Sequence, residues 1–558
     1  MSEDTPDQGG TPDPYAAPQQ PGPGQPPYGE PGAQAPGYGS PAPGQPPYGQ
    51  PVPPDQSGYG QPAYGGPMGY QGPPTRSRRG AALGAGALVL TLVAGAGVYA
   101  ASRVDGGGTQ PEELVPASAF AFGKLDLDPA ADQKVAIREF ASKFPEAPKP
   151  RGDENITDAL LKGAFDQDKC VDFETDIKPW LGDRVGMAGI TGTDGKPVPL
   201  VLVQVKDEAK LRAVKGKLDG CDKDAGSDEL KGLTFAKGYA VFSNTQADSD
   251  GAVKAAAKAS LKDADNFNGD LAKLDGNQVV VMWADLERSF NAASKGSPEL
   301  GMVPNGVTKY LKGRVVMGVH MEGDYAEVYG QTIGGNLAEV YGADAFTGIK
   351  DLGALPANTV AAMSINGLET YVTKMLDQFN ETGMPVDDFF AQFKDETGLD
   401  VRKDIIPLLG SKTTFAIGGD LTKLMEDPRV GVKSVVKDPA NAKKVGAKLV
   451  DLAGKDEFEL ESSVDGETFY LTTKGYTAEL KAGGLGDTPQ FKKAMGDLGD
   501  GLVQGVYVNI AEMMKAVPES DDPDDAKDMK SIEPLSAFGA SVGKKDNDAF
   551  FRYRLVVR

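Results

Sequence analysis

The stretch Asp176–Ile190 reads DIKPWLGDRVGMAGI, and Asp404–Gly419 reads DIIPLLGSKTTFAIGG. Both begin with the same Asp-Ile-x-Pro-x-Leu-Gly block and continue into a β-rich apolar run. Aspartates at matched places, Asp172 with Asp400 and Asp176 with Asp404, are interpreted as turn or cap groups. A match of this kind, separated by more than 200 residues, predicts that the chain contains one structural unit twice.

Five further pairs of blocks match in the same order, with offsets of about 220 to 240 residues. They are LVPASAFAFGKLDLD from Leu114 with ALPANTVAAMSINGL from Ala354, VLVQVKDEAKLRAVKGKL from Val201 with VGVKSVVKDPANAKKVGAKL from Val430, GLTFAKGYAVF from Gly232 with GETFYLTTKGYTAEL from Gly466, VVVMWADLERS from Val279 with VQGVYVNIAEMM from Val503, and VVMGVHMEGDYAEVYG from Val315 with AFGASVGKKDNDAFFRYR from Ala537. We therefore predict an internal duplication, with copy 1 at 114–345 and copy 2 at 346–558.

Within each copy, strand-period runs alternate with amphipathic stretches. Turn signals between the β-rich runs predict hairpins at Asp194-Gly195, Glu322–Asp324, Asp465-Gly466 and Lys544–Asn547. A helix is expected at Asp132–Lys143. Another should follow Asp207 as its cap, with Ala209, Leu211, Val214 and Leu218 on its apolar stripe. Hairpins imply antiparallel sheets, and the helices must cover a face, so the predicted fold class is α+β: two tandem copies of an antiparallel-sheet-plus-helices module.

The first 79 residues differ from the rest of the chain. They hold 21 of the 41 prolines in repeated units such as PGQPPYGEP at Pro23–Pro31. Such a tract has few side chains to bury, so we predict a disordered Pro/Gly/Tyr-rich tail. Whether it is a spacer or a tyrosine-bearing docking segment for protein partners stays open.

The segment Gly80–Ser102 contains 23 residues without a charge. As a helix it would be about 34 Å long, enough to cross a hydrocarbon core of about 30 Å. Arg76, Arg78 and Arg79 precede it and Arg103 follows it, so the positive-inside rule places the tail in the cytoplasm and the rest of the chain outside. We therefore predict a single-pass membrane protein with one transmembrane helix at 80–102 and a linker at 103–113.

Two alternatives concern this segment. A cleavable signal peptide is the rival interpretation, but 79 residues before the apolar segment are too many for one. Glycines within the segment could also let two such helices pack closely, so a homodimer through the span is a hypothesis.

Charge and composition exclude several function classes. The formal net charge of -22 argues against nucleic acid and anionic membrane surfaces as partners. With one histidine and two cysteines, we expect no catalytic residue, no cofactor and no metal site. His320 is interpreted as a satisfied strand histidine. The GxSxG pattern at Gly539–Gly543 would mark a hydrolase nucleophile only if a helix followed directly, and a turn signal follows instead.

Cys170 and Cys221 both lie in copy 1. On the outer side of a membrane thiols oxidise, so we predict one disulfide between them. Cys170 is matched by Gly398 in the second copy, which makes the bridge an addition to one copy rather than part of the shared fold. Two free buried thiols are the alternative.

The Pro-Gly-Tyr tail, the arginine-flanked span, the VPA opening and the blocks CVDFETDIKPWLGD and GLDVRKDIIPLLGS together resemble a known family. It comprises single-pass membrane proteins of actinobacteria, including streptomycete-type ones, classed as domain of unknown function 3352. The resemblance covers residues 76–558 and implies no known activity. The cysteine pair is not taken from that pattern.

The expected function is that of a membrane-anchored extracytoplasmic binding or scaffolding protein of the cell envelope, without catalysis. A groove between the two copies is the default site. One alternative is a carrier for an apolar ligand, which an enclosed pocket of Val, Leu and Phe would favour. Another is an envelope hydrolase, which a cleft with two carboxylates about 5 to 9 Å apart would favour.

Overall fold

The structure is a computed structural model, and it describes residues 108–145, 147, 158–159, 161–162, 171–221, 230–296, 312–335, 337–381, 386–424, 426–454, 459–517 and 529–558. The predicted tail at 1–79, the predicted span at 80–102 and the first five residues of the linker, 103–107, lie outside these residues. Among the described helices, none has the length and apolar character needed to span a membrane.

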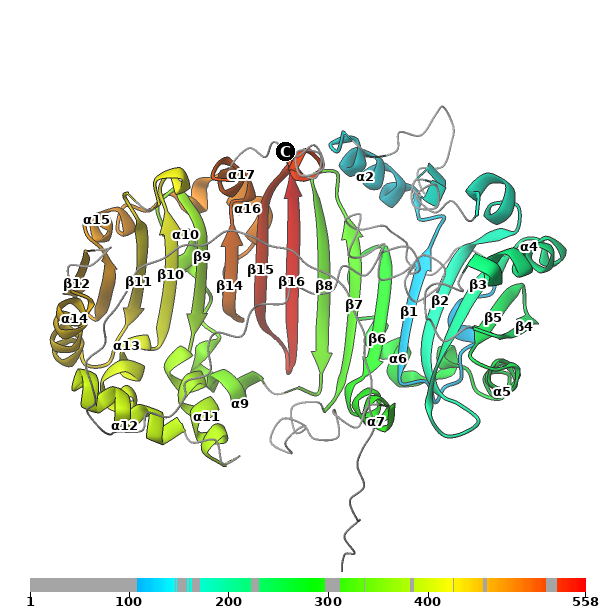
Figure 1. The fold of residues 1–558 in the computed structure, drawn as a ribbon, viewed down its shortest axis with the longest axis horizontal. Helices are drawn as coiled ribbons and strands as arrows, with labels where there is room; N and C mark the ends of the chain where they lie inside the picture. The colour runs from blue at the N-terminus through cyan, green and yellow to red at the C-terminus, as the bar shows by residue number, and fades with distance from the viewer. Residues whose placement is uncertain are drawn as a thin grey trace, which may run out of the picture. The chain divides into compact units, whose positions relative to one another are not determined.

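The strands of the described chain form one sixteen-stranded antiparallel sheet (Figure 1). They are β1 Ala121–Asp126, β2 Leu181–Thr191, β3 Pro197–Val205, β4 Gly232–Ala236, β5 Tyr239–Ser243, β6 Val280–Asp285, β7 Arg314–Met321, β8 Tyr325–Ile333, β9 Thr359–Asn366, β10 Lys412–Gly418, β11 Arg429–Val435, β12 Leu460–Asp465, β13 Thr468–Thr473, β14 Leu502–Val508, β15 Leu535–Lys545 and β16 Asp548–Val557.

Helices connect and cover these strands. The α-helices are α2 Ala131–Ser142, α4 Glu208–Cys221, α5 Gln246–Ala256, α6 Asp265–Leu271, α7 Leu286–Gly296, α9 Leu337–Tyr341, α10 Lys350–Gly353, α11 Leu368–Glu381, α12 Val386–Thr397, α13 Ile406–Leu409, α14 Pro439–Ala453, α15 Tyr476–Leu480, α16 Pro489–Met495 and α17 Ile510–Lys515. Short helical turns include η1 Pro111–Glu113, η2 Phe173–Ile177, η4 Leu261–Asp263, η7 Val401–Ile405 and η9 Leu485–Asp487. The α+β class with a large antiparallel sheet is thus confirmed.

The strand order repeats. From one outer edge it runs β4-β5-β3-β2-β1-β6-β7-β8, and from the other it runs β12-β13-β11-β10-β9-β14-β15-β16. Adding eight to each strand number of the first series gives the corresponding strand of the second series. The two series meet where β8 pairs antiparallel with β16, from Tyr325 opposite Val556 to Thr332 opposite Ala549. We call this pair the seam.

The seam changes the expectation of a groove between two copies. Each series ends in a strand with an unpaired edge, and such an edge is a ready template for another strand. Because β8 and β16 pair with each other, the two series continue one sheet. The two copies are therefore not separate modules with an open groove between them, and the hollow at their junction is lined by residues of both series.

Local sequence signals explain why the matched blocks adopt the same structure. The side chain of Asp172 accepts a hydrogen bond from Thr175 N, and that of Asp400 accepts from Arg402 N and Lys403 N. The N–H of each capping aspartate in turn donates to Asp176 Oδ2 or Asp404 Oδ2, at 2.8 Å in both cases. The interpretation of these four aspartates as cap and turn groups is confirmed.

The predicted hairpins and helices are also present, with small differences. All four turn signals join consecutive antiparallel strands. Asp207 caps α4 by accepting from Lys210 N at 3.1 Å. Leu211 is buried and Val214 half-buried, but Ala209 is exposed, so its assignment to the apolar stripe is wrong.

Two faces of the sheet carry different layers. On the helix-covered face, α10, α15 and α16 pack on the second series, around Tyr476, Phe491 and Tyr507. On the same face of the first series, α5, α6 and η4 enclose Phe267 and Trp283. The opposite face is covered toward its two ends, by α2, η2 and α4 at one end and by α14 with η7 at the other.

Buried tyrosines give the second series a pH dependence. Burial raises the pKa of Tyr476 to about 12, and its hydroxyl has no hydrogen-bond partner among the described residues. Between pH 10 and 12 the unfolded chain loses this proton while the folded chain keeps it, so stability falls as pH rises. Two pKa units correspond to roughly 3 kcal/mol.

We expect Tyr476→Phe to flatten this alkaline loss and to stabilise the protein by about 1 kcal/mol at pH 7, because it removes an unpaired buried hydroxyl. Urea unfolding at pH 8, 10 and 11.5 measures both effects. Tyr553→Phe, at a tyrosine that is 39% exposed, is the matched control. Parallel pH profiles for Tyr476→Phe and the parent would contradict the expectation.

Candidate binding surface

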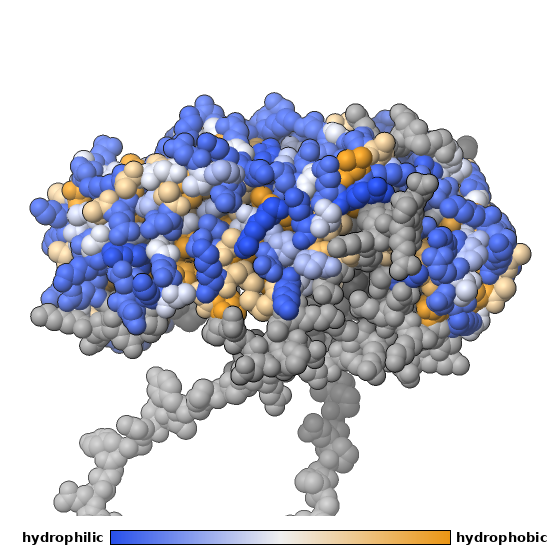
Figure 2. Space-filling view, turned by 90° about the horizontal axis from the view of Figure 1, so that it is seen from above, coloured by the Kyte–Doolittle hydropathy of each residue, from blue (hydrophilic) through white to orange (hydrophobic). Residues whose placement is uncertain are grey.

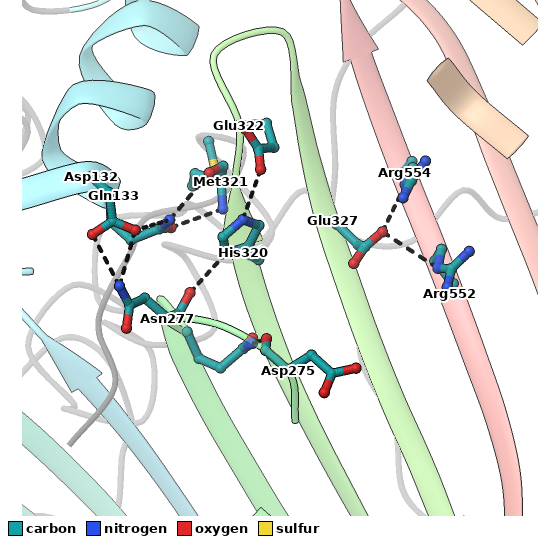
Figure 3. A network of polar contacts seen from close by, with 11 residues as sticks. Asp132, Gln133, Asp275, Asn277, His320, Met321, Glu322, Glu327, Arg552 and Arg554 are labelled. Carbon is teal, nitrogen blue, oxygen red and sulfur yellow. Dashed lines mark hydrogen bonds and ion pairs between the residues drawn. The ribbon is translucent and has the colours of Figure 1, made fainter. Parts of the chain in front are cut away.

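The helix-covered side of the seam is held by ion pairs between the two series. Glu327 of β8 accepts from Arg554 Nε at 2.7 Å and lies 3.4 Å from Arg552 Nε. Figure 3 shows the carboxylate of Glu327 pointing between the two arginines of β16. Arg554 also lies 4.7 Å from the ring centre of Tyr325, whose pKa is raised by burial.

Further ion pairs cross the seam from loops and strand ends. Lys273 contacts Asp548 at 2.6 Å, Lys545 lies 3.8 Å from Asp275, and Asp324 contacts Lys493. Between them is a hollow of about 330 Å³, whose walls carry both signs of charge together with Tyr329 and Phe550. The hollow is lined by charged residues, so it does not match the pocket of Val, Leu and Phe expected of an enclosed carrier.

His320 belongs to a structural network beside the seam (Figure 3). Its Nδ1 lies 2.8 Å from Asn277 O and its Nε2 lies 3.1 Å from Glu322 Oε1. The side chain of Asn277 donates to Asp132 on α2. Both ring nitrogens have partners, which agrees with the interpretation of His320 as a satisfied strand histidine.

The other side of the central strands is apolar, and no helix of the described residues covers its middle. Side chains alternate along a strand, so residues between the helix-facing ones point to the opposite face. We call the apolar group on that side the open face, and it consists of Phe415, Ile417, Met363, Ile365, Val506, Val508, Phe538, Ala540, Val542, Phe551, Tyr553 and Leu555. None of these residues belongs to the four buried clusters of the described chain.

The strand register makes the open face continuous. One row runs from strand to strand through Tyr553, Ala540, Val506, Met363 and Phe415, each opposite the next. At about 4.8 Å between strands, five strands give a surface about 24 Å wide. A patch of this size is comparable to the largest apolar patches of soluble proteins, which are often functional.

Aromatic rings form the part of the open face next to the seam. Tyr553 stacks on Phe538 with ring centres 6.4 Å apart and contacts Phe551 at 5.6 Å. Tyr553 is 39% exposed and Ile417 is 36% exposed. The other members are half-buried.

The figures show how this surface differs from its surroundings. Figure 1 looks onto the open face: α10 and α16 lie behind the sheet, and no helix of the described residues crosses the middle of β14, β15 and β16. Seen from above, the surface around the strand ends is mostly hydrophilic, with smaller hydrophobic patches between (Figure 2).

The residues singled out from the sequence fall elsewhere. Cys170, Arg76, Arg78, Arg79 and Arg103 lie outside the described residues. Of Cys221 only the backbone is described, at the end of α4.

The GxSxG pattern lies inside β15, with Ser541 buried against the helix-covered face. It is not at a turn from strand to helix, so it does not have the context of a hydrolase nucleophile.

Sequence reasoning missed the open face. The available signal was that β15 is rich in apolar or small residues at both alternating positions. An antiparallel strand with one solvated face usually alternates apolar with polar residues, so this pattern indicates a strand that is covered on both sides.

Comparison with known proteins gives one match. Residues 82–232 match a family model described as "Protein of unknown function (DUF3352)". The match begins inside the predicted span and ends at the start of β4, so it covers a smaller part of the chain than the resemblance drawn from the sequence. Comparison with curated proteins and comparison with solved structures each gave no significant match.

Proposed function

We propose that this chain is a membrane-anchored, extracytoplasmic binding protein of the cell envelope, and that the open face is its binding surface. The observation that carries the proposal is the apolar open face of β14, β15 and β16, whose middle no helix of the described residues crosses, whereas α16 packs on the other face of these strands. Apolar area left in water is unfavourable by about 25 cal/mol per Å², so a permanent surface of this kind favours an occupant.

The proposed role is binding and not catalysis. The polar groups at the seam are paired across it: Glu327 is held by two guanidinium groups, and Asp548 by Lys273. Such contacts join the two series and leave the open face in one fixed arrangement. The identical strand order supports the further proposal that the two series arose by duplication of one unit.

Thiol protection tests the proposed function. Tyr553→Cys places a thiol on the open face, and Leu452→Cys places one on the exposed side of α14, where Leu452 is 46% exposed. The full chain is expressed in cells, and intact cells are treated with a membrane-impermeant maleimide. The parent chain gives the background from Cys170 and Cys221.

We expect the Leu452→Cys thiol to react quickly in intact cells, which also tests the extracytoplasmic location. The Tyr553→Cys thiol should react at least tenfold more slowly there, and at the faster rate after purification in detergent. Equal rates in intact cells would show an unoccupied open face and overturn the proposed function. No reaction of Leu452→Cys in intact cells would overturn the location.

The predicted disulfide is part of the same proposal, because it requires an oxidising compartment. We expect a non-reducing peptide map of the chain isolated from its membrane to contain one linked peptide pair joining Cys170 to Cys221. Reduction with dithiothreitol should separate the pair. Alkylation of both thiols without prior reduction would contradict the disulfide and weaken the extracytoplasmic assignment.

A further inference from the structure

The chemistry of the open face restricts what can occupy it. Its backbone groups are paired within the sheet on both sides of each central strand. Hydrogen-bonding side chains on this side of the sheet include those of Tyr553 and Gln504. Gln504 lies between Val542 and Ile365, and its Oε1 already accepts from the Tyr341 hydroxyl. A partner bound there is recognised mainly by apolar contact, which suits hydrocarbon better than a polar molecule.

The shape and composition of the surface point to a flexible occupant. Met363 lies at the centre of the continuous row, between Val506 and Phe415. Methionine is unbranched and adapts to irregular neighbours. The width of about 24 Å exceeds the roughly 15 Å of one leaflet's hydrocarbon, half of a 30 Å core, so an extended acyl chain fits across it.

A second copy of the chain is disfavoured as the occupant. Each chain carries a formal net charge of -22, and two such bodies repel each other as they approach. The open face has no cationic side chain to offset that repulsion.

The position of the predicted anchor supplies the source of hydrocarbon. The predicted span ends at Ser102 and the first described helical turn begins at Pro111. Eight residues between them reach at most about 30 Å. The folded unit is therefore held close to a bilayer, where acyl chains are the most concentrated apolar groups.

We propose that the open face holds the acyl chains of a membrane lipid that has left the bilayer. This inference rests on the proposed function and names the ligand class of the same surface. Because the acyl chain runs across the strands, the lipid head group would remain in water beyond the lateral edge of the open face.

Photocrosslinking tests the lipid assignment. The full chain is placed in nanodiscs that contain a phospholipid with a diazirine near the end of one acyl chain, illuminated and digested. We expect crosslinks in peptides from β14–β16 in addition to those from 80–102. Tyr553→Asp should reduce the open-face crosslinks at least fivefold, while Leu452→Asp, an exposed apolar residue outside the open face, should leave them unchanged.

A milder variant and a comparison with the thiol experiment complete the test of the lipid inference. If Tyr553→Asp changes the circular dichroism spectrum, Ile417→Asn is the milder variant on the same surface. Crosslinks confined to 80–102 would overturn the lipid inference. If the Tyr553→Cys thiol nevertheless reacts slowly in intact cells, the proposed function stands and the occupant is a protein segment. If that thiol reacts fast, the lipid inference and the proposed function are both overturned.

Discussion

Replacing Glu112 with alanine is expected to lower the free energy of unfolding by about 3 to 5 kcal/mol. Glu112, in η1, lies 2.9 Å from Lys124 of β1, and each side chain is only 4% exposed. Removing the carboxylate leaves an ammonium group buried without its counter-charge. Desolvating a charge costs several kcal/mol, and that cost is offset only while the ion pair is intact.

Urea unfolding at pH 7 measures this loss. Glu174→Ala is the matched control, because Glu174 forms an exposed pair with Lys178 at 3.1 Å, and its loss should stay below about 0.5 kcal/mol. The double variant Glu112→Leu/Lys124→Met should recover most of the stability, since it removes both charges. Similar small losses in Glu112→Ala and Glu174→Ala would show that the pair is hydrated in solution.

The second series shows that the position of Lys124 in the fold does not need a charged side chain. The matched block places Ser364 where Lys124 stands in the first series, and Ser364 Oγ lies 3.2 Å from Thr414 Oγ1. Both Ser364 and Thr414 are buried. One topology thus accepts an ion pair in one series and a pair of hydroxyl groups in the other, which supports the expected rescue by uncharged residues.

Gly539→Ala is expected to destabilise the protein by about 3 kcal/mol. A Cβ at Gly539 of β15 would lie 2.2 Å from the carbonyl oxygen of Ala494. Ala494 belongs to α16, whose Phe491 and Met495 are also buried in the core. The methyl group would meet backbone, so α16 as a whole must move away from the sheet.

Gly216→Ala in α4 is the opposite control. Nothing lies within 4 Å of a Cβ built at Gly216, and alanine is favoured over glycine inside a helix by about 0.5 to 1 kcal/mol. Thermal unfolding should therefore show a lower Tm for Gly539→Ala and an equal or slightly higher Tm for Gly216→Ala. An unchanged Tm for Gly539→Ala would mean that α16 does not pack as closely as the structure shows.

Gly539 and Gly543 show that residues of an apparent catalytic motif can have a packing role instead. In the sequence, Gly539 is the first residue of a GxSxG pattern. In the structure it allows close approach of a helix, and Gly543 lies beside the carbonyl of Gly501 in the same way. The two glycines of the GxSxG pattern are therefore explained by close contacts of β15 with Ala494 and Gly501. These contacts join segments far apart in the chain, so they cannot be read from the sequence.

Much of the local structure was determined by the sequence alone. The six matched blocks predicted one unit used twice, and the strand order repeats accordingly. Asp172 and Asp400 were identified as caps because their partners lie within three residues along the chain. Turns and caps depend on short-range hydrogen bonds, so the residues that form them appear together in the sequence.

The tertiary structure alone decided how the two series meet and which surface stays open. The backbone of β8 does not specify β16 as its partner, because an edge strand offers the same backbone groups to any strand of suitable register. The charge match of Glu327 with Arg552 and Arg554 becomes visible only once the two strands are seen side by side. The apolar and small residues at both alternating positions of β15 could have been covered on either side. Contacts from α16, through Ala494 and Met495, cover one side, and Phe538, Phe551 and Tyr553 remain on the other. That choice depends on packing between segments far apart in the chain, so the alternation within a single strand could not reveal it.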